Sequence, residues 1–323
     1  MKLLVTGGAG YVGSVAASQL VAAGHETVVL DDLSKGHEDA VPEGARLVKG
    51  NLLDERFVRG TLSGGFDGVL HFAALSLVGE SVEKPELYYR NNVCGTLGLL
   101  EAMREAGVRR MVFSSTAAVY GEPEVVPITE NEPAMPTNPY GATKLAVDRM
   151  ISAYATAHGL AATSLRYFNV AGASRGLGED HDPETHLIPL VLKAAANDTA
   201  IKIFGTDYAT PDGTAVRDYI HIEDLGRAHL LALESSKPGE HRIYNLGNGA
   251  GFSVREVVEA ARRVTGREIE AIEAPRRAGD PPELVASSKK IRGELGWKPE
   301  KPSLEAMISD AWTWMRSHPK GYE

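Results

Sequence analysis

The chain has 323 residues, of which 43% are hydrophobic and 24% are charged, as in an ordinary globular protein. Its net charge is −9 and it shows no stripe of basic residues, which argues against nucleic acid as a partner. The single cysteine, Cys94, excludes an intramolecular disulfide, and no apolar run has the length of a signal peptide or a membrane span. We therefore expect a cytoplasmic protein without a membrane partner.

Residues 3–32 follow the pattern of a nucleotide-binding unit. An apolar strand at 3–5 leads into a glycine turn, and a helix follows the turn. Gly7, Gly10 and Gly13 have the G-x-x-G-x-x-G spacing, in which glycine lets the backbone turn tightly and approach a pyrophosphate. The pyrophosphate then lies at the helix N-terminus, so the turn predicts a dinucleotide site.

A second apolar strand, at 27–30, ends in Asp31 and Asp32. A carboxylate at the end of this strand accepts hydrogen bonds from the adenosine ribose hydroxyls and repels a 2′-phosphate. We therefore predict NAD rather than NADP as the cofactor, with Asp31 as the selecting residue.

Strands and helices then alternate as far as residue 169. The predicted elements are strands at 46–48, 67–74, 110–113 and 162–169 and helices at 85–106 and 140–158. This alternation predicts an α/β fold with a Rossmann-type, doubly wound parallel sheet. After residue 170, short strands and helices are separated by irregular loops. We expect residues 1–170 to form an NAD-binding Rossmann domain. Residues 171–323 are expected to form mainly a smaller, mixed α/β lobe that binds the substrate.

Tyr140 and Lys144 lie four residues apart in the predicted helix, so their side chains share one face. An ammonium close to a phenol favours the phenolate and lowers the tyrosine pKa, which makes Tyr140 a candidate general base for a hydroxyl. Thr116 follows the strand at 110–113, and ligands of open α/β sheets bind at the carboxyl ends of strands. With NAD, these residues predict hydride transfer. Tyr140 takes the hydroxyl proton, Thr116 bonds the same oxygen, and Lys144 keeps the tyrosine ionised and bonds the nicotinamide ribose.

The chain resembles the UDP-glucose (UDP-galactose) 4-epimerase family of the extended short-chain dehydrogenase/reductase superfamily along nearly its whole length. The matching stretches are 5–13, 71–74, 78–82, 91–93, 113–116, 138–141, 166–169, 212–214, 216–221, 244–247 and 274–277. The resemblance implies that NAD stays tightly bound and is regenerated in each turnover. It implies that the sugar is oxidised to a 4-ketose, swings about its link to the diphosphate and is reduced from the opposite face. It also implies a homodimer joined through the helices at 85–106 and 140–158.

The resemblance assigns residues to both ligands. The cofactor is expected to contact Gly7, Gly10, Tyr11, Val12, Gly13, Asp31, Asp32, Ser34, Asn51, Leu52, Phe72, Ala73, Ala74, Asn91, Ser114, Tyr140, Lys144, Tyr167 and Phe168. The UDP-sugar is expected to contact Thr116, Tyr140, Asn169, Thr185, His186, Leu187, Phe204, Arg217, Tyr219, Arg277, Asp280 and Leu284. Each arginine of this set can hold a phosphate bidentately, and Phe204 is expected near the uracil.

Three positions depart from the family pattern. Thr116 stands where many members have serine, but the hydroxyl is kept. Asn51 stands where many have aspartate beside the adenine, and because its amide oxygen can still accept a hydrogen bond, we expect a weaker cofactor contact. Ser76 replaces a lysine found in some members, which removes one cationic contact to the cofactor.

The histidines do not predict a metal site. His181, His186 and His221 have spacings that match no metal-ligand pattern known to us, and hydride transfer needs no metal. We expect His186 to bond the substrate diphosphate and the other two to be structural.

Competing functions differ from epimerisation in particular residues. Nucleotide-sugar 4,6-dehydratases of the superfamily follow the threonine with Asp-Glu, whereas Ala117 and Ala118 stand there in this chain, so elimination lacks its acid and base. A net dehydrogenase would exchange its cofactor in every turnover. A non-catalytic NAD-sensing module can lose the tyrosine or the lysine, and both remain here.

The identity of the sugar stays open. Leu284 falls where strictly glucose- and galactose-specific members have a tyrosine, so an N-acetyl group has room near C2 unless neighbouring side chains fill the gap. The carboxylate of UDP-glucuronate needs donors or a cation, which Ala117 and Ala118 do not supply and Arg175 could. We rank UDP-glucose and UDP-galactose first, ahead of UDP-glucuronate and the UDP-N-acetylhexosamines.

Overall fold

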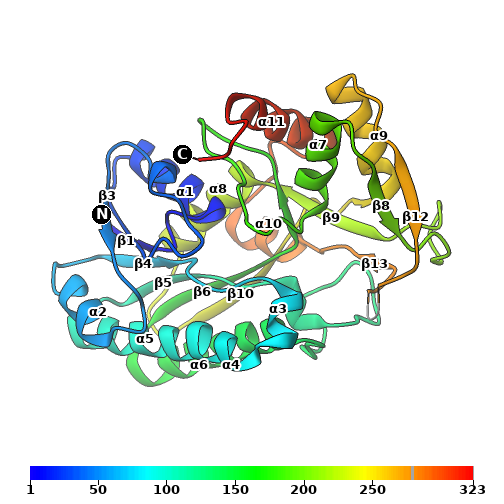
Figure 1. Cartoon of the computed structure of the whole chain (residues 1–323). Helices are drawn as coiled ribbons and strands as arrows, with labels where there is room; N and C mark the ends of the chain where they lie inside the picture. Colours follow the sequence, from blue (N-terminus) through cyan, green and yellow to red (C-terminus); the bar gives the residue numbers. More distant parts are fainter. Residues whose placement is uncertain (278–279, 323) are drawn as a thin grey trace.

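The computed structural model describes residues 1–277 and 280–322 (Figure 1). Its centre is a seven-stranded sheet of order β10-β6-β5-β4-β1-β2-β3, in which every neighbouring pair is parallel. The strands are β1 (Lys2–Thr6), β2 (Glu26–Asp31), β3 (Ala45–Lys49), β4 (Gly68–His71), β5 (Arg110–Ser114), β6 (Ala161–Tyr167) and β10 (His241–Leu246). Most of these strands are apolar along their length, because helices cover both faces of the sheet. The predicted Rossmann-type, doubly wound sheet is confirmed.

Two layers of helices enclose the sheet. In Figure 1 the lower layer holds α2 (Glu55–Leu62), α5 (Gly95–Ala106) and α6 (Pro139–His158), and the upper layer holds α1 (Tyr11–Ala22), α8 (Ile222–Glu234) and α10 (Lys289–Leu295). A separate buried apolar cluster fills each interface, with Leu62 and Leu99 in the lower one and Leu20 and Leu225 in the upper one. None of the helices in the described ranges combines the length and apolar character needed to cross a membrane.

The sheet draws on both halves of the chain. β10 pairs with β6 along its whole length, and α8 packs against α1. Both elements come from residues after 170, so the expected boundary at that residue does not follow the sheet. The segment 222–246 returns to the nucleotide-binding side. The apolar pattern of β10 shows that it is a strand, but it carries no information about which strand it pairs with.

The other elements after residue 168 form a smaller lobe, at the upper right of Figure 1. They are β7 (Asn169–Ala171), α7 (Leu187–Asn197), β8 (Ile201–Phe204), β9 (Val216–His221), β11 (Gly251–Ser253), α9 (Val254–Thr265), β12 (Ala271–Ala274), β13 (Glu283–Leu284) and α11 (Leu304–Ser317). β9 pairs with β7, β11 and β13, and β8 pairs with β12. Leu192, Val257 and Met307 belong to the buried cluster that joins α7, α9 and α11.

The helix predicted at 85–106 is interrupted in a way that the sequence did not show. α4 (Pro85–Tyr88) and α5 are joined by a π-helical segment, η2 (Tyr89–Cys94), and α3 (Val78–Glu83) precedes them. π-helical turns are frequent at functional sites because they redirect side chains. Here Asn92 is buried, accepts a hydrogen bond from the Leu75 backbone N at 2.9 Å and donates one to the Leu75 carbonyl at 3.0 Å. The segment thereby fixes the loop that follows β4.

Local signals define α6, the helix that carries the tyrosine and the lysine. The side chain of Asn138 caps it by accepting a hydrogen bond from the Gly141 backbone N at 2.9 Å, and Pro139 occupies the first turn. Gly159, in a left-handed conformation, ends the helix. Shorter 3-10 turns, η1 (Glu38–Ala40) and η3 (Ala117–Tyr120), follow β2 and β5.

A buried ion pair attaches α6 to the sheet. Arg166 of β6 donates to Oδ2 of Asp148 from Nε at 3.0 Å and from Nη2 at 2.9 Å. The two side chains are only 6% and 3% exposed. Removing one partner of such a pair leaves an uncompensated buried charge and typically lowers stability by about 3–5 kcal/mol. The pair therefore fixes the position of α6 more firmly than a surface salt bridge could.

Candidate active site

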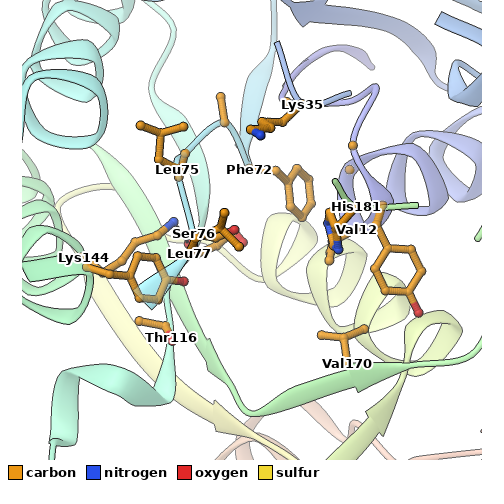
Figure 2. A pocket seen from close by; sticks show the side chains of 18 of the residues that line it. Val12, Lys35, Phe72, Leu75, Ser76, Leu77, Thr116, Lys144, Val170 and His181 are labelled. Carbon is orange, nitrogen blue, oxygen red and sulfur yellow. Dashed lines mark hydrogen bonds between the residues drawn. The ribbon is translucent and has the colours of Figure 1, made fainter. Parts of the chain in front are cut away.

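A cavity of about 500 Å³ lies at the carboxyl ends of the sheet strands and is lined from both the sheet and the small lobe (Figure 2). All residues assigned to the cofactor from the sequence line it, from Gly7 in the glycine turn to Phe168. The residues assigned to the substrate that line it are Thr116, Tyr140, Asn169, His186, Arg217 and Leu284. Figure 2 shows Lys144 and Thr116 on one side of the cavity and Val12 and His181 on the other.

The glycine turn is shaped by two close approaches of the backbone. Gly7 has φ +71°, and a Cβ on it would lie 2.5 Å from the backbone N of Ala73. A Cβ on Gly13 would collide with the Gly7 carbonyl oxygen. The N-cap of α1, Gly10, offers no side-chain cap, so the first N–H groups of the helix remain available where residues 10–13 line the cavity. This cradle suits a pyrophosphate.

Asp31 does more than the sequence predicted. Its Oδ2 accepts a hydrogen bond from the Ala9 backbone N at 3.0 Å, and its Oδ1 accepts one from the Leu33 backbone N at 2.9 Å. Burial raises the pKa of this carboxyl, and the hydrogen bonds from Leu33 and Ala9 oppose that rise. Asp31 therefore braces the glycine turn and also presents its carboxylate to the cavity.

The contact expected from Asn51 is not the one that the structure shows. Its amide oxygen accepts a hydrogen bond from the Leu53 backbone N at 2.8 Å, and its Nδ2 donates to Oδ2 of Asp32 at 2.7 Å. The oxygen that was expected to face the adenine is thus used within the loop. Asn51 holds Asp32 in place at this end of the cavity.

Thr116, Tyr140 and Lys144 converge although they come from different elements. Lys144 is 3% exposed, and its Nζ donates to the Ser114 carbonyl at 2.8 Å and lies 6.0 Å from the centre of the Tyr140 ring. Thr116 and Tyr140 both line the cavity, and Thr116 lies close enough to Tyr140 to lower the pKa of the phenol. α6 places its tyrosine and lysine one turn apart, and the end of β5 supplies both the threonine and the carbonyl that anchors the lysine.

Burial governs the protonation of this group. Desolvation lowers the pKa of Lys144 to about 7, against the opposing charge of Asp148. Desolvation raises the pKa of Tyr140, Tyr167 adds to the rise, and the hydrogen bond with Thr116 opposes it. The expectation that Lys144 lowers the tyrosine pKa is therefore wrong for the protein side chains alone. An additional positive charge in the cavity, such as that of an oxidised nicotinamide, would favour the phenolate.

The remaining substrate residues lie beside the cavity rather than on its wall. Thr185, Leu187, Phe204, Tyr219, Arg277 and Asp280 are the expected contacts that do not line it. Arg217 forms an ion pair with Asp280, so its guanidinium already has a partner. The guanidinium carbon of Arg277 lies 4.1 Å above the ring of Phe204. The Arg217–Asp280 pair and the Arg277–Phe204 pair are linked, because the Asp280 backbone N donates to the Arg277 carbonyl at 3.4 Å.

One part of the cavity wall was missed by the sequence analysis. Glu179, His181, Asp182 and Pro183 line the cavity from the loop between β7 and α7. Lys35, in the segment between β2 and η1, donates to the Asp182 carbonyl at 2.8 Å, which ties this loop to the segment that follows β2. The glycine-rich, polar composition of the segment signalled a long loop but not its destination. Ser76, which replaces a lysine, also lines the cavity.

These features define a dinucleotide-dependent enzyme of the short-chain dehydrogenase/reductase type, because the cofactor cradle and an acid–base group share one cavity. The chain belongs to the NAD dependent epimerase/dehydratase family, which it matches over residues 3–247. NAD is the cofactor, and the residues present fit it, since a Cβ would fill the cradle at Gly7 and Gly13 and Asp31 presents a carboxylate where the ribose would lie.

Individual relatives are more specific. The chain is 62% identical over 325 residues to a UDP-glucose 4-epimerase of Streptomyces lividans, covering 100% of this chain and 98% of that protein. It is similar to a crystal structure of a UDP-glucose 4-epimerase with a TM-score of 0.97 and 52% identity over 100% of both chains. The structure of UDP-glucose 4-epimerase from Bifidobacterium longum in complex with NAD⁺ and UDP has a TM-score of 0.93 and 36% identity, again over 100% of both chains.

Proposed function

We propose that this chain interconverts UDP-glucose and UDP-galactose by inverting C4 of the sugar with bound NAD. One observation carries the proposal. The cavity that contains the cofactor cradle is also lined by Thr116 and Tyr140, and it continues to Asn169 and Arg217 of the small lobe. A sugar attached to a diphosphate could therefore lie with C4 at the tyrosine and its diphosphate at the lobe.

The side chains of the chain move and hold the proton. Tyr140, as the phenolate, accepts the proton of the C4 hydroxyl and returns it to the keto oxygen when C4 is reduced. Thr116 donates a hydrogen bond at the same place and orients the oxygen. Lys144, anchored by the Ser114 carbonyl, lies 6.0 Å from the centre of the tyrosine ring and favours the phenolate in its protonated form. NAD, when bound, supplies the hydride acceptor and the donor for the two halves of the reaction.

The cavity wall that we place around C4 suits a sugar that must rotate between oxidation and reduction. Leu75, Leu77, Ala117, Ala118 and Leu284 line the cavity with apolar or small side chains. Such a wall makes few directional contacts, so it leaves a 4-ketose free to rotate about its bond to the diphosphate. We place the diphosphate at Asn169, His186 and Arg217. The uridine would lie at the expected substrate contacts that do not line the cavity, which are Thr185, Leu187, Phe204, Tyr219, Arg277 and Asp280.

The same residues separate the proposal from its competitors. Ala117 and Ala118 supply no acid or base for elimination, and the tyrosine and lysine of a working enzyme are both in place. Arg175, which could have received the carboxylate of UDP-glucuronate, is exposed and does not line the cavity. The cytoplasm is the location that we propose for this activity, and fractionation of the source cells would test it.

Replacing Tyr140 by Phe should remove the general base and lower kcat by about 10²–10⁴-fold while leaving NAD bound. The assay follows conversion of UDP-galactose to UDP-glucose by chromatography, without added cofactor. Tyr154→Phe is the matched control, because Tyr154 lies on the same helix but bonds Glu101 outside the cavity. Near-normal turnover of Tyr140→Phe, or no conversion by the unmodified protein, would contradict the proposal.

UDP-N-acetylhexosamines are the second substrate class that a particular residue favours. Leu284 lines the cavity and packs against a small buried cluster that includes Phe168, and the leucine itself brings no ring or hydroxyl to this position. Room near C2 would admit an N-acetyl group in addition to the hydroxyl of glucose. The N-acetyl sugars therefore rank behind UDP-glucose as substrates rather than outside the range.

Leu284→Tyr should lower kcat/KM for UDP-N-acetylglucosamine relative to UDP-glucose by about tenfold or more, because a pocket that rejects a group by shape discriminates by about 1–3 kcal/mol. Leu284→Met, which keeps the size and the apolar character, serves as the control and should leave the ratio unchanged. An unchanged ratio in the tyrosine variant would show that neighbouring side chains, not Leu284, set the room near C2. UDP-glucuronate as the best substrate of the unmodified protein would overturn the substrate ranking.

We propose that the chain forms a homodimer through the helical run from α4 to α5, together with α6. Leu87, Tyr89 and Leu97 expose 40%, 45% and 43% of their surface on this run, and exposed apolar side chains that gather on one face favour association. Leu97→Arg should shift the mass measured by light scattering from dimer to monomer. Ile272→Arg, at an exposed apolar position of β12, is the control. A monomeric unmodified protein at micromolar concentration would refute the proposal.

A further inference from the structure

The loop between β7 and α7 brings two carboxylates and two imidazoles together. Glu179, His181, Glu184 and His186 each direct one possible ligand atom into a space in which all four atoms lie within 4.8 Å of one another. Nδ1 of His186 lies 2.7 Å from Glu179 Oε1 and 3.2 Å from Glu184 Oε1. Nδ1 of His181 lies 3.1 Å from Glu179 Oε1 and 3.9 Å from Glu184 Oε2. In each histidine, Nδ1 is therefore the ring nitrogen that lies next to the carboxylates.

These separations match the edges of a metal tetrahedron. Zn²⁺ binds imidazole nitrogen at about 2.0–2.1 Å and carboxylate oxygen at about 2.0–2.2 Å, so neighbouring ligand atoms in a tetrahedral site lie roughly 3.4 Å apart. The four nitrogen–oxygen distances, two to Glu179 Oε1 and one to each oxygen of Glu184, lie between 2.7 and 3.9 Å, on either side of that value.

The burial of Glu184 is a second, independent observation. Its side chain is 3% exposed, and Glu184 Oε2 has no hydrogen-bond partner among the described residues. A buried carboxylate oxygen without a partner is costly, and such groups in folded proteins are normally paired or bound to a cation. Glu179 is also buried, with 8% of its side chain exposed. Two nearly inaccessible carboxylates at one point need a positive charge beside them, which either a protonated His186 or a bound cation can supply.

We propose that Glu179, His181, Glu184 and His186 bind one Zn²⁺ ion as a closed, four-coordinate structural site. Two nitrogen and two carboxylate ligands suit Zn²⁺, whereas Mg²⁺ and Ca²⁺ prefer sites made of oxygen alone. The two carboxylates balance the charge of the ion. The sequence analysis, which considered the histidines and their spacing, expected no metal; the two glutamates complete the set.

The zinc site stabilises the loop that forms part of the cavity wall, and it takes no part in the epimerisation. With all four positions filled by side chains, the ion has no open position for a substrate atom. It ties together the loop in which Glu179 and His181 line the cavity, and His186 stands one residue before α7. Coordination through Nδ1 leaves the Nε2–H of His186 free to donate a hydrogen bond into the cavity, so metal binding and the diphosphate contact proposed above are compatible.

The test measures the metal itself. The purified full chain is stripped with a chelator, incubated with ZnSO₄, desalted and analysed for zinc by mass spectrometry. One zinc per chain is expected for the unmodified protein. Glu184→Gln, which keeps the shape and removes the charge, should weaken zinc binding at least tenfold. His158→Asn, at an exposed position of α6 outside the cluster, is the control and should bind one equivalent.

Co²⁺ provides a reading that does not depend on a variant. Co²⁺ added to the stripped, unmodified protein should give the intense visible absorption of a tetrahedral site, and excess Zn²⁺ should remove it. The thermal midpoint of the stripped protein should rise on addition of Zn²⁺ and not of Mg²⁺. Failure of the unmodified protein to retain zinc, retention by Glu184→Gln equal to the control, or a weak octahedral cobalt spectrum would each overturn the proposal, leaving a hydrogen-bonded cluster of charged side chains.

Discussion

A buried ion pair between Asp148 and Arg166 determines where the reactive helix lies. Together with the apolar contacts of Val147 and Ile151, it holds α6 against the sheet, so that Tyr140 and Lys144 lie near Thr116 at the end of β5. The pair lies one turn beyond the lysine and is almost inaccessible to water. Removing one partner of the pair would lower the free energy of unfolding by several kcal/mol, which is a large share of the stability of a typical domain. The precision of the acid–base group therefore depends on a contact that does not touch any ligand.

Burial has opposite effects on the two titrating residues of that group. It raises the pKa of Tyr140 and lowers the pKa of Lys144 to about 7, because water is replaced by protein around both. The protein side chains alone therefore favour the neutral phenol. A cationic ring in the cavity would move the phenol in the reactive direction. We therefore expect the proposed base, Tyr140, to be more reactive with the oxidised cofactor bound than without it.

Residues whose role depends on near neighbours in sequence could be predicted from the sequence. The glycine turn, Asp31 at the end of β2 and the Tyr140–Lys144 spacing are set by single elements, and each lies where the pattern placed it. Three features depend on partners far along the chain and could not be predicted. β10 joins the sheet from beyond residue 170, Asn51 lines the cavity but bonds Asp32 and Leu53, and the loop that contains Glu179 lines the cavity as well. Nothing in the local pattern of these segments specifies the partner.

The central claim is that one cavity both oxidises C4 and reduces it again without releasing the cofactor. The most direct measurement uses UDP-galactose deuterated at C4, with an excess of unlabelled NADH in solution, and determines the label in the UDP-glucose formed by mass spectrometry. The account predicts that the deuterium is retained at C4 of the product. Loss of the label to the NADH in solution, or to water, would contradict it.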